Sequence, residues 1–282
     1  MSAPDQPAAA TGAEPTQQSP VPAYLDARRA FAAHYLFGEG IEVGPLHLPL
    51  AIPPHARVRY VDRMTVEDLR KHYAELAEWD LTPVDIVDNG EQLATIEAES
   101  QDFIVANHFL EHTENPIGTI QTHLGKLKPG GILFYAVPDK RFTFDYRRPV
   151  TLLEHLVADY EEGPERSRAE HYEQWTRGVP GEIHPEATEE EIVARARELD
   201  ALDYSIHMHV WTQAEFLAMI LEVRARTDGA FDIEAAARQG IEFMVVLRKA
   251  GPLPAIPAPP PAASRRQKAR RALRAAKREL VG

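Results

Sequence analysis

The fold is decided by two neighbouring segments, SQDFIVANHFLEHTENP (residues 100–116) and LKPGGILFYAVP (residues 127–138). Each contains an uninterrupted apolar run, which is typical of a strand that is buried on both faces. Residues 116–127 between the two runs have the pattern of a helix, which ends at KPGG (residues 128–131). A strand, a helix and a second strand in this order predict two neighbouring parallel strands joined by a helix.

Further strands are predicted on both sides of this unit. They cover residues 41–43, 57–62, 84–87, 231–234 and 242–247. The last two are expected to close the sheet as a pair. A helix is predicted from Thr65 to Ala77, with Thr65 as its N-cap and Asp68 three residues on. Alternating strands and helices predict an α/β fold, a Rossmann-like doubly wound sheet of seven mostly parallel strands.

Composition divides the chain into a folded domain and three flanking parts. Residues 1–21 are rich in Ala, Pro and Gln and are predicted to be a disordered leader. Residues 22–250 form the predicted domain, followed by a Pro-rich linker (251–263) and a basic helical tail (264–282). Within the domain, residues 139–230 exceed the one helix and one strand that a minimal fold needs there. They predict a helical insertion between strands five and six that covers the substrate.

Composition also limits the classes of protein that this chain can belong to. Apolar residues make up 44% of its 282 residues, which is enough for a substantial core. No apolar run approaches the ~20 residues that span a bilayer, and the N-terminus lacks the pattern of a secretory signal. The sequence has no cysteine, which excludes disulfides, thiolate catalysis and Cys-ligated metal sites. A cytoplasmic enzyme is therefore expected.

Charge is distributed unevenly along the chain. The net charge is −12, yet residues 264–282 carry eight Lys and Arg against one Glu, so the remainder carries −19. An acidic body is not expected to bind nucleic acid. The basic tail has a narrow apolar stripe, which is suited to weak peripheral contact with an anionic membrane. Contact of the tail with nucleic acid and a solvated helix are the alternatives.

A glycine and several polar residues follow the first three predicted strands. Gly44 follows the first strand, Asp62 ends the second, and Asp88-Asn89-Gly90 follow the third. At the carboxyl edge of a doubly wound sheet, a glycine turn lets the backbone approach a nucleoside cofactor, and an acid accepts its ribose hydroxyls. The plainer interpretations are a strand-end cap for Asp62 and an Asx turn for Asp88-Asn89.

These motifs, taken in order, resemble those of class I S-adenosylmethionine-dependent methyltransferases over about residues 38–140. GIEVGPLHLPL (40–50) is similar to the glycine-rich first motif, VRYVD (58–62) to the second, and VDNGEQL (87–93) to the adenine-reading turn. The two segments quoted first are similar to the fourth- and fifth-strand motifs. The resemblance is to the broad type 11-like branch, which includes ubiquinone-pathway and sugar O-methyltransferases.

The resemblance implies S-adenosylmethionine as cofactor and a set of residues that bind it. Glu42 would hold the cofactor's amino group, and Gly44 and Asn107 would meet its methionine end. Asp62 would bind the ribose hydroxyls, and Asp88 with Asn89 would meet the adenine amino group. The implied cofactor-binding residues are Glu42, Gly44, Asp62, Asp88, Asn89 and Asn107.

One departure from the family pattern leaves a second function open. Only Gly44 stands where the family has three glycines, and the bulky residues Pro45, Leu46 and His47 follow it. The alternative to an enzyme is therefore a non-catalytic, methyltransferase-like binding module with a degraded glycine motif.

The first candidate cluster for acceptor chemistry is His108-Phe-Leu-Glu111-His112. An oxygen acceptor needs a general base or a metal, and His108 and His112 are candidate bases. Some ubiquinone-pathway relatives bind a divalent cation through a Glu-x-x-Glu-His pattern. Here His108 replaces the first Glu, so a divalent metal is not favoured, because magnesium prefers oxygen ligands.

Two further clusters are candidates for catalysis and for binding the acceptor. Asp139, just past the fifth strand, can accept a proton, and Arg141 and Arg148 can clamp a carboxylate or phosphate. Downstream, a pair of histidines two residues apart would share one face of a strand and line a sugar or aromatic pocket, or bind zinc with a third ligand. The substrate-binding candidates from this stretch are His171, His207, His209 and Trp211.

The insertion and the aromatic residues in it point to a sizeable acceptor. The function expected from the sequence is O-methylation of a sugar, glycan or natural-product hydroxyl. The expected partner is thus a small-molecule or glycan acceptor.

Overall fold

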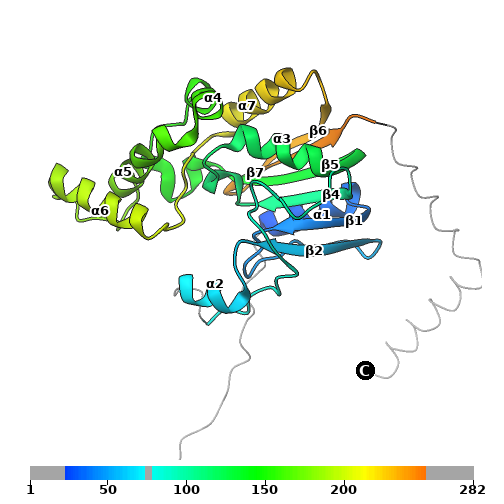
Figure 1. The fold of residues 1–282 in the computed structure, drawn as a ribbon, viewed down its shortest axis with the longest axis horizontal. Helices are drawn as coiled ribbons and strands as arrows, with labels where there is room; N and C mark the ends of the chain where they lie inside the picture. The colour runs from blue at the N-terminus through cyan, green and yellow to red at the C-terminus, as the bar shows by residue number, and fades with distance from the viewer. Residues whose placement is uncertain (1–22, 74–77, 252–282) are drawn as a thin grey trace, which may run out of the picture. The chain divides into compact units, whose positions relative to one another are not determined.

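The computed structural model describes residues 23–73 and 78–251. They form a seven-stranded sheet in the order β3-β2-β1-β4-β5-β7-β6 (Figure 1). The strands are β1 (Gly38–Val43), β2 (Ala56–Asp62), β3 (Ile86–Val87), β4 (Gln101–Asn107), β5 (Leu127–Pro138), β6 (Phe231–Gln239) and β7 (Glu242–Lys249). The predicted leader, linker and basic tail lie outside the described residues, and the predicted domain boundaries stay predictions.

The unit that opened the sequence analysis lies at the centre of the sheet. β4 and β5 are parallel neighbours, with Val105 opposite Phe134, and α3 (Pro116–Lys126) connects them. The side chain of Asn115 accepts from the backbone N–H of Gly118 and so caps the start of α3. β5 to β7 and β7 to β6 are antiparallel, as the predicted closing pair requires. The predicted doubly wound, mostly parallel sheet is confirmed.

Two layers of helices explain why the central strands are apolar on both faces. On one face, Ile104 and Ala106 pack with α3, α4 (Leu153–Glu162) and α7 (Gln213–Arg226). On the other face, Phe103 and Val105 pack with α1 (Ala23–Tyr35). Because side chains alternate along a strand, this two-sided burial needs an unbroken apolar run.

The crossovers on the N-terminal side of the sheet are poor in helix. Residues 44–55, all of them described, contain no helix between β1 and β2. α2 (Val66–His72) follows β2, and the hydroxyl of Thr65 accepts from Asp68 N–H, which confirms the predicted N-cap. The helix ends at His72, before the predicted end at Ala77. β3 has only two residues, fewer than predicted, because it pairs with the end of β2 alone.

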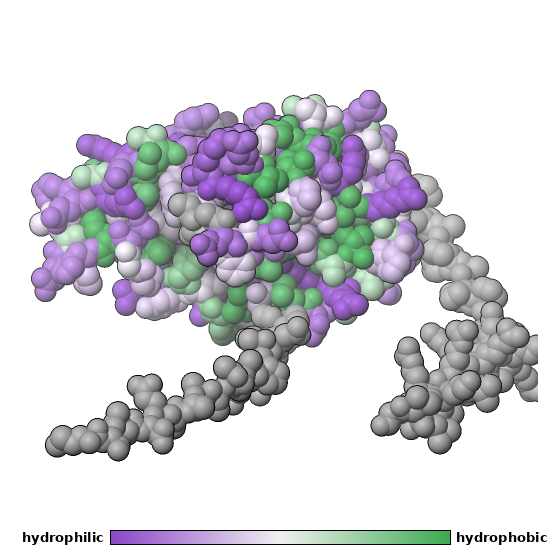
Figure 2. All heavy atoms as spheres, turned by 90° about the horizontal axis from the view of Figure 1, so that it is seen from below, coloured by the Kyte–Doolittle hydropathy of each residue, from purple (hydrophilic) through white to green (hydrophobic). Residues whose placement is uncertain are grey.

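The predicted helical insertion lies between β5 and β6. After the short helices η3 (Lys140–Phe142) and η4 (Phe144–Arg147) it contains α4, η5 (Pro164–Arg166), α5 (Arg168–Gly178), α6 (Glu189–Ala201) and α7. Figure 1 shows α4, α5 and α6 extending to one side of the sheet. Seen from below, the surface mixes small hydrophobic areas with hydrophilic side chains (Figure 2). Within the described residues, none of the helices is long and apolar enough to cross a bilayer.

Candidate functional site

The carboxyl ends of β1, β2 and β4 bring three predicted cofactor residues to one edge of the sheet. Val43 pairs with Val61 on one side and with Ala106 on the other. The next residues along these strands are Gly44, Asp62 and Asn107. Chain direction alone therefore gathers them, as the doubly wound topology requires.

Gly44 makes the turn at which the chain leaves β1. Its φ of +62° lies in the left-handed region, which favours glycine. A Cβ built on Gly44 would have its nearest neighbour, a carbon of Phe109, 3.6 Å away, so the space beside this backbone is open. The following turn is closed by Leu48 N–H, which donates to the carbonyl of Pro45 at 2.9 Å. The single glycine thus leaves an open backbone edge.

Glu42 is buried beside this turn and is already engaged by the protein. The backbone N–H of Leu50 donates to both of its carboxylate oxygens, at 2.9 and 3.1 Å. Burial raises the pKa of Glu42 to about 7, against the lowering effects of Leu50 N–H, Arg28 and Asn107. Glu42 closes the 44–50 loop, and its contact with the cofactor's amino group stays a prediction.

Asp62 presents a carboxylate at the end of β2. Burial raises the pKa of Asp62 to about 6, although the backbone N–H groups of Arg63 and Met64 act in the opposite direction. The N–H of Arg63 donates to Oδ1 at 2.7 Å. This geometry suits a carboxylate that accepts further hydrogen bonds from a ligand.

Asp88 and Asn89 stabilise their own loop. Asn89 Oδ1 accepts from the N–H groups of Glu91 and Gln92, which is the Asx turn that was the plainer interpretation of this pair. Asp88 Oδ2 accepts from the N–H and the hydroxyl of Thr95, both at 2.7 Å. The backbone N–H of Asp88 donates to the carbonyl of Asp62, so the loop does lie beside the predicted ribose-binding residue. Contact with adenine stays a prediction.

Asn107 has two buried polar atoms that need a partner. Neither its Oδ1 nor its Nδ2 makes a hydrogen bond of good geometry with a described residue, although the amide lies close enough to Glu42 to lower the pKa of that carboxyl group. Buried polar groups in proteins are nearly always paired, so such an orphan marks a place for a ligand or water. The open edge of Gly44, the buried carboxylate of Asp62 and this amide fit a polar nucleoside cofactor.

His108 belongs to a charged network that the sequence did not predict. Its backbone has a φ of +50°, and its Nε2–H donates to Glu242 at 2.8 Å. Arg28 Nε–H also donates to Glu242, at 2.7 Å. Burial lowers the pKa of His108, although the bond to Glu242 acts in the opposite direction. Nδ1, the nitrogen left to accept a proton, lies 3.9 Å from the buried carboxyl group of Glu111, which makes His108 a poorer candidate for the predicted base. No sequence signal links residues 28, 108 and 242.

Asp139 and Arg141 pair with each other, which corrects two predictions. The buried carboxylate of Asp139 accepts from Arg141 N–H, Nε–H and an Nη–H at 3.1, 2.9 and 2.6 Å. Against the effect of burial, these bonds hold the pKa of Asp139 below its ordinary value. Asp139 is therefore not a free base, and Arg141 is not a free clamp.

Arg148 is buried, which corrects a third prediction. It donates to Asp145 at 3.0 Å and to the backbone carbonyls of His207 and Met208 at 2.7 and 3.3 Å. Arg148 therefore holds the 207–208 backbone in place and cannot clamp an acceptor anion.

The residues that remain near the sheet edge are Glu111, His112, Asp145 and His207, which we call the sheet-edge cluster. Nδ1–H of His207 donates to Asp145 at 2.6 Å, and the rings of His112 and His207 lie edge to face, 4.8 Å apart. Although burial opposes it, the bonds from His207 and Arg148 hold the pKa of Asp145 below its ordinary value. The cluster therefore contains an ionised carboxylate that orients an imidazole.

His112 and Glu111 have strongly perturbed protonation. Burial, together with nearby His207, lowers the pKa of His112 to about 3, and its Nδ1–H donates to the Ile206 carbonyl. Burial raises the pKa of Glu111 well above its ordinary value. Neither of its carboxylate oxygens hydrogen-bonds with a described residue, and Oε1 lies 3.9 Å from Nδ1 of His108. Glu111, His112 and His207 lie close enough together to hold a metal ion.

Two aromatic rings frame His207. Phe144 lies 4.9 Å and Trp175 5.7 Å from its ring, between centroids. Phe144 is 46% exposed, so this frame reaches the surface.

The structure separates His207 from His209, which corrects the prediction that they share a strand face. Residues 207–210 are not a strand. His207 faces Asp145, whereas His209 faces Asp159 at 3.4 Å. Trp211 is fully buried and stacks on His209, so it is a core residue and not a pocket wall.

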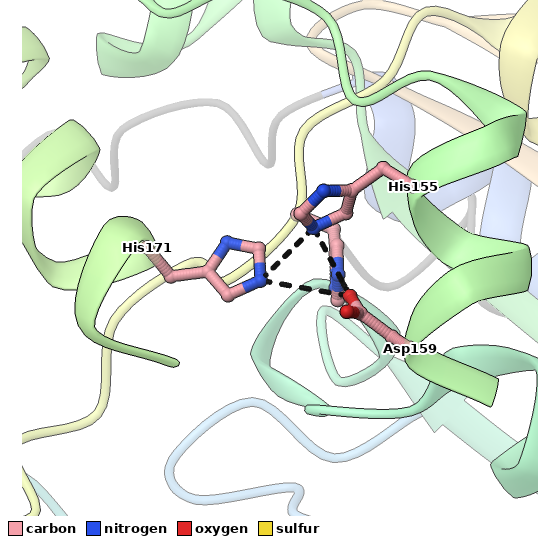
Figure 3. A group of neighbouring side chains, drawn as sticks. His155, Asp159 and His171 are labelled. Atoms are coloured by element: carbon pink, nitrogen blue, oxygen red, sulfur yellow. Dashed lines mark hydrogen bonds and ion pairs between the residues drawn. The ribbon is translucent and has the colours of Figure 1, made fainter. Parts of the chain in front are cut away.

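His209 belongs to a second group, His155, Asp159, His171 and His209, which we call the insertion cluster. The side chains of His155, Asp159 and His171 point toward one another from α4 and α5 (Figure 3). His171 is 3% exposed, so it is not available to a substrate as predicted. The insertion cluster, like the sheet-edge cluster, could hold a metal ion.

A groove elsewhere contains none of the predicted site residues. It lies where β1 and β2 begin. Its lining consists of Glu39, Gly40, Arg57, Val58, Arg59, Ile86, Thr95, Ile96, Glu97, Ser100 and Gln101. Ligands of doubly wound sheets bind at the opposite, carboxyl edge.

Comparison with known families gives one match. Residues 50–217, more than half of the chain, match the model of a family described as a methyltransferase domain. The match begins after Glu42 and Gly44, so the atypical glycine turn lies outside it. No curated protein matches the chain.

Solved structures resemble the fold distantly. CurJ carbon methyltransferase is 12% identical, with a TM-score of 0.40, over 77% of this chain and 49% of its own, so this chain spans about half of its length. An S-adenosylmethionine-dependent methyltransferase from Aquifex aeolicus is 11% identical (TM-score 0.41, 80% and 88% covered). A Rhodobacter sphaeroides protein, provisionally named a Zn-dependent alcohol dehydrogenase, is 12% identical (TM-score 0.47, 79% and 89% covered). Because these sequence identities and TM-scores are low, the family assignment depends on the match of residues 50–217 to the family model.

Proposed function

This chain belongs to the methyltransferase domain family, and from that premise we propose that it transfers a methyl group from S-adenosylmethionine to a hydroxyl of a sugar, glycan or natural product. The observation that carries this proposal is the pairing of His207 with ionised Asp145 beside the strand-end residues. The cofactor, when bound, supplies an electrophilic methyl group. The protein must therefore hold the cofactor, orient the acceptor and remove its proton.

The cofactor would be held at the edge formed by Gly44, Asp62 and Asn107. Asp62 would accept the ribose hydroxyls, which a buried carboxylate with remaining acceptor capacity suits. The orphaned amide of Asn107 and the open backbone at Gly44 would face the methionine end.

His207 is the best candidate for the general base. Its Nδ1–H is bound by Asp145, which fixes the tautomer and leaves Nε2 with the lone pair that can accept a proton. Asp145 would stabilise the imidazolium that forms. His112 is a weaker base, because a pKa of about 3 means that its imidazole binds a proton only weakly at neutral pH. We therefore replace the sequence-based candidates His108, His112 and Asp139 with His207 as base and Asp145 as the residue that positions it.

The surroundings of His207 favour a neutral, ring-shaped acceptor. Phe144, which is 46% exposed, provides a face on which a sugar or aromatic ring can stack, and the buried ring of Trp175 supports it from behind. The guanidinium groups of Arg141 and Arg148 are bound by Asp139 and Asp145, so neither provides a free clamp for an anion. A hydroxylated, uncharged ring fits both observations.

The alternative, a non-catalytic binding module, is favoured by the region after β1. Gly44 is followed by a turn instead of a helix, and Leu50 N–H occupies the carboxylate of Glu42. Cofactor binding without turnover would identify this alternative.

Titration calorimetry with S-adenosylmethionine and S-adenosylhomocysteine tests the first step. We expect saturable binding to the wild-type chain and weaker binding to Asp62→Asn. Asp85→Asn is the control, because Asp85 is an exposed carboxylate just before β3 that accepts from the N–H of Tyr60. No heat of binding at millimolar cofactor would contradict the proposal. Turnover is then measured as S-adenosylhomocysteine release with a panel of sugars and phenols, and binding without release by any acceptor would support the binding module.

A further inference from the structure

The insertion cluster has the geometry of a closed metal site, and we propose that His155, Asp159, His171 and His209 bind one Zn²⁺ ion that ties the helical insertion together. Each residue offers one ligand atom, and all four atoms lie within 4.8 Å of one another. Three imidazoles and one carboxylate are ligands that zinc accepts in tetrahedral sites.

The distances between ligand atoms fit a zinc ion. Asp159 Oδ2 lies 3.0 Å from His155 Nε2, 3.4 Å from His209 Nε2 and 3.8 Å from His171 Nε2. His155 Nε2 and His171 Nε2 lie 3.2 Å apart. Ligands at 2.0–2.1 Å from a tetrahedral zinc are separated by about 3.3–3.4 Å, so small shifts bring these atoms into its coordination sphere.

The hydrogen bond made by His209 sets its tautomer. Nδ1 of His209 lies 3.1 Å from the carbonyl of Thr113, an acceptor, so Nδ1 carries the proton. In the neutral imidazole, Nε2 then presents its lone pair to the carboxylate of Asp159. Two lone pairs that face each other in a fully buried place repel unless a cation lies between them.

The contact between His155 and His171 leads to the same conclusion. Only one proton fits between two Nε2 atoms 3.2 Å apart, and each atom also faces Asp159. A divalent cation can accept all three imidazole lone pairs and neutralise the carboxylate at the same time. Protons alone cannot satisfy all four groups together.

Outer hydrogen bonds hold the carboxylate in a ligating orientation. Ser167 Oγ–H donates to Oδ1 of Asp159 at 2.7 Å, and Arg166 lies 3.3 Å from the same atom. Oδ2 is therefore the oxygen that is left for the three histidines. Partners of this kind are typical of metal sites, in which they orient the ligands.

The site would link three parts of the insertion. His155 and Asp159 lie one turn apart on α4, His171 lies on α5, and His209 lies on the segment that leads to α7. All four protein ligands are supplied, so the site is closed in the manner of a structural zinc site. The ion would thereby fix the segment that also carries His207. This inference does not depend on the proposed methyl transfer.

Metal content of the full chain tests the proposal. The chain is purified without a polyhistidine tag or chelator, and its metal is measured by mass spectrometry. We expect about one zinc per chain, since one tetrahedral site uses all four ligands. After stripping, added Zn²⁺ should restore the melting temperature, and Co²⁺ should give the visible spectrum of tetrahedral coordination.

Matched variants locate the ion. Asp159→Asn and His209→Gln should each abolish stoichiometric zinc, and Ser167→Ala should weaken its affinity by about 10–100-fold. His112→Gln, in the sheet-edge cluster, is the control and should keep its zinc. If the buried variants fail to fold, His155→Gln serves instead, because this side chain is 23% exposed. No zinc uptake by the wild-type chain, or zinc lost from His112→Gln but kept by His155→Gln, would overturn the assignment.

Discussion

The sheet-edge cluster and the insertion cluster share one short segment, yet they differ in what their histidines face. His207 binds a carboxylate through Nδ1, and its ring lies beside Phe144, an aromatic side chain that reaches the surface. His209, two residues on, binds a backbone carbonyl through Nδ1 and turns its other nitrogen toward a buried carboxylate. The first arrangement orients a base, and the second completes a ligand set.

The difference shows that the group hydrogen-bonded to Nδ1 influences which role the other ring nitrogen, Nε2, can take. A carboxylate on Nδ1 stabilises the imidazolium, which suits proton transfer. A carbonyl on Nδ1 fixes the tautomer and leaves the lone pair on Nε2, which is the nitrogen that a metal can use. Residue type and spacing are the same in both cases, so only the partners distinguish them.

The largest expected effect separates the two histidines directly. His207→Gln should lower turnover by about 10²–10⁴-fold, the usual contribution of a general base, and leave cofactor affinity unchanged. Steady-state kinetics and calorimetry measure the two quantities. His209→Gln is the control and should lower the melting temperature more than His207→Gln does. Equal turnover in His207→Gln and wild type would contradict the role of His207 as a base and remove the proposed difference from His209.

A second prediction concerns Asp62, the carboxylate proposed to bind the cofactor, which belongs to neither cluster. Asp62→Asn should weaken cofactor binding by roughly 10–100-fold, because a charge-assisted hydrogen bond contributes about 1.5–3 kcal/mol. Since burial raises the pKa of Asp62 to about 6, its ionised form is present above that pH and is lost as the pH falls through it. Wild-type affinity should therefore decrease on acidification below pH 6.

Calorimetry across pH 5–8 checks the second prediction. The Asp62→Asn variant should show a flatter pH dependence than the wild type, because its side chain does not titrate. Parallel pH profiles in the two proteins would mean that another group, such as Glu42 with its pKa of about 7, controls binding.

Chelation should affect the two clusters differently. Brief exposure to EDTA should not abolish methyl transfer at once, because His207 acts with Asp145 and without a metal. The rate should decrease only slowly, as zinc leaves and the segment that carries His207 loosens. The melting temperature should fall by roughly 5–10 °C as zinc leaves the insertion cluster. Immediate loss of turnover that an added divalent transition-metal ion restores would instead place a catalytic metal at Glu111, His112 and His207.

The smallest expected effect concerns the pair beside the sheet edge. Arg141→Ala should change the free energy of unfolding only slightly, because its side chain is 51% exposed and water can replace it at Asp139. Turnover and the KM for the acceptor should stay at the wild-type values. A large rise in KM would restore Arg141 as an acceptor clamp, and denaturant unfolding with kinetics decides the matter.

Much of the fold was predictable because it depends on local patterns. The apolar runs at 100–107 and 127–138 must be buried on both faces, which predicts central strands of a layered sheet. Parallel strands place their carboxyl ends at one edge, so Gly44, Asp62 and Asn107 could be gathered from sequence order alone. The glycine at 44 was also predictable, since its left-handed φ favours that residue.

The partners of the polar side chains were decided by tertiary structure. His207 meets Asp145 across 62 positions, and Arg28 meets Glu242 across 214. Asp139 and Arg148 were wrongly predicted as free groups, although the residues that pair with them, Arg141 and Asp145, lie only two and three positions away in the sequence. By itself, the sequence determined the strands, their direction and the edge at which ligands bind, because these follow from periodicity and burial. Only the tertiary structure decided which histidine is suited to act as a base and which to bind a metal. The reason is that the burial and the hydrogen-bond partners of these histidines come from segments far apart in sequence.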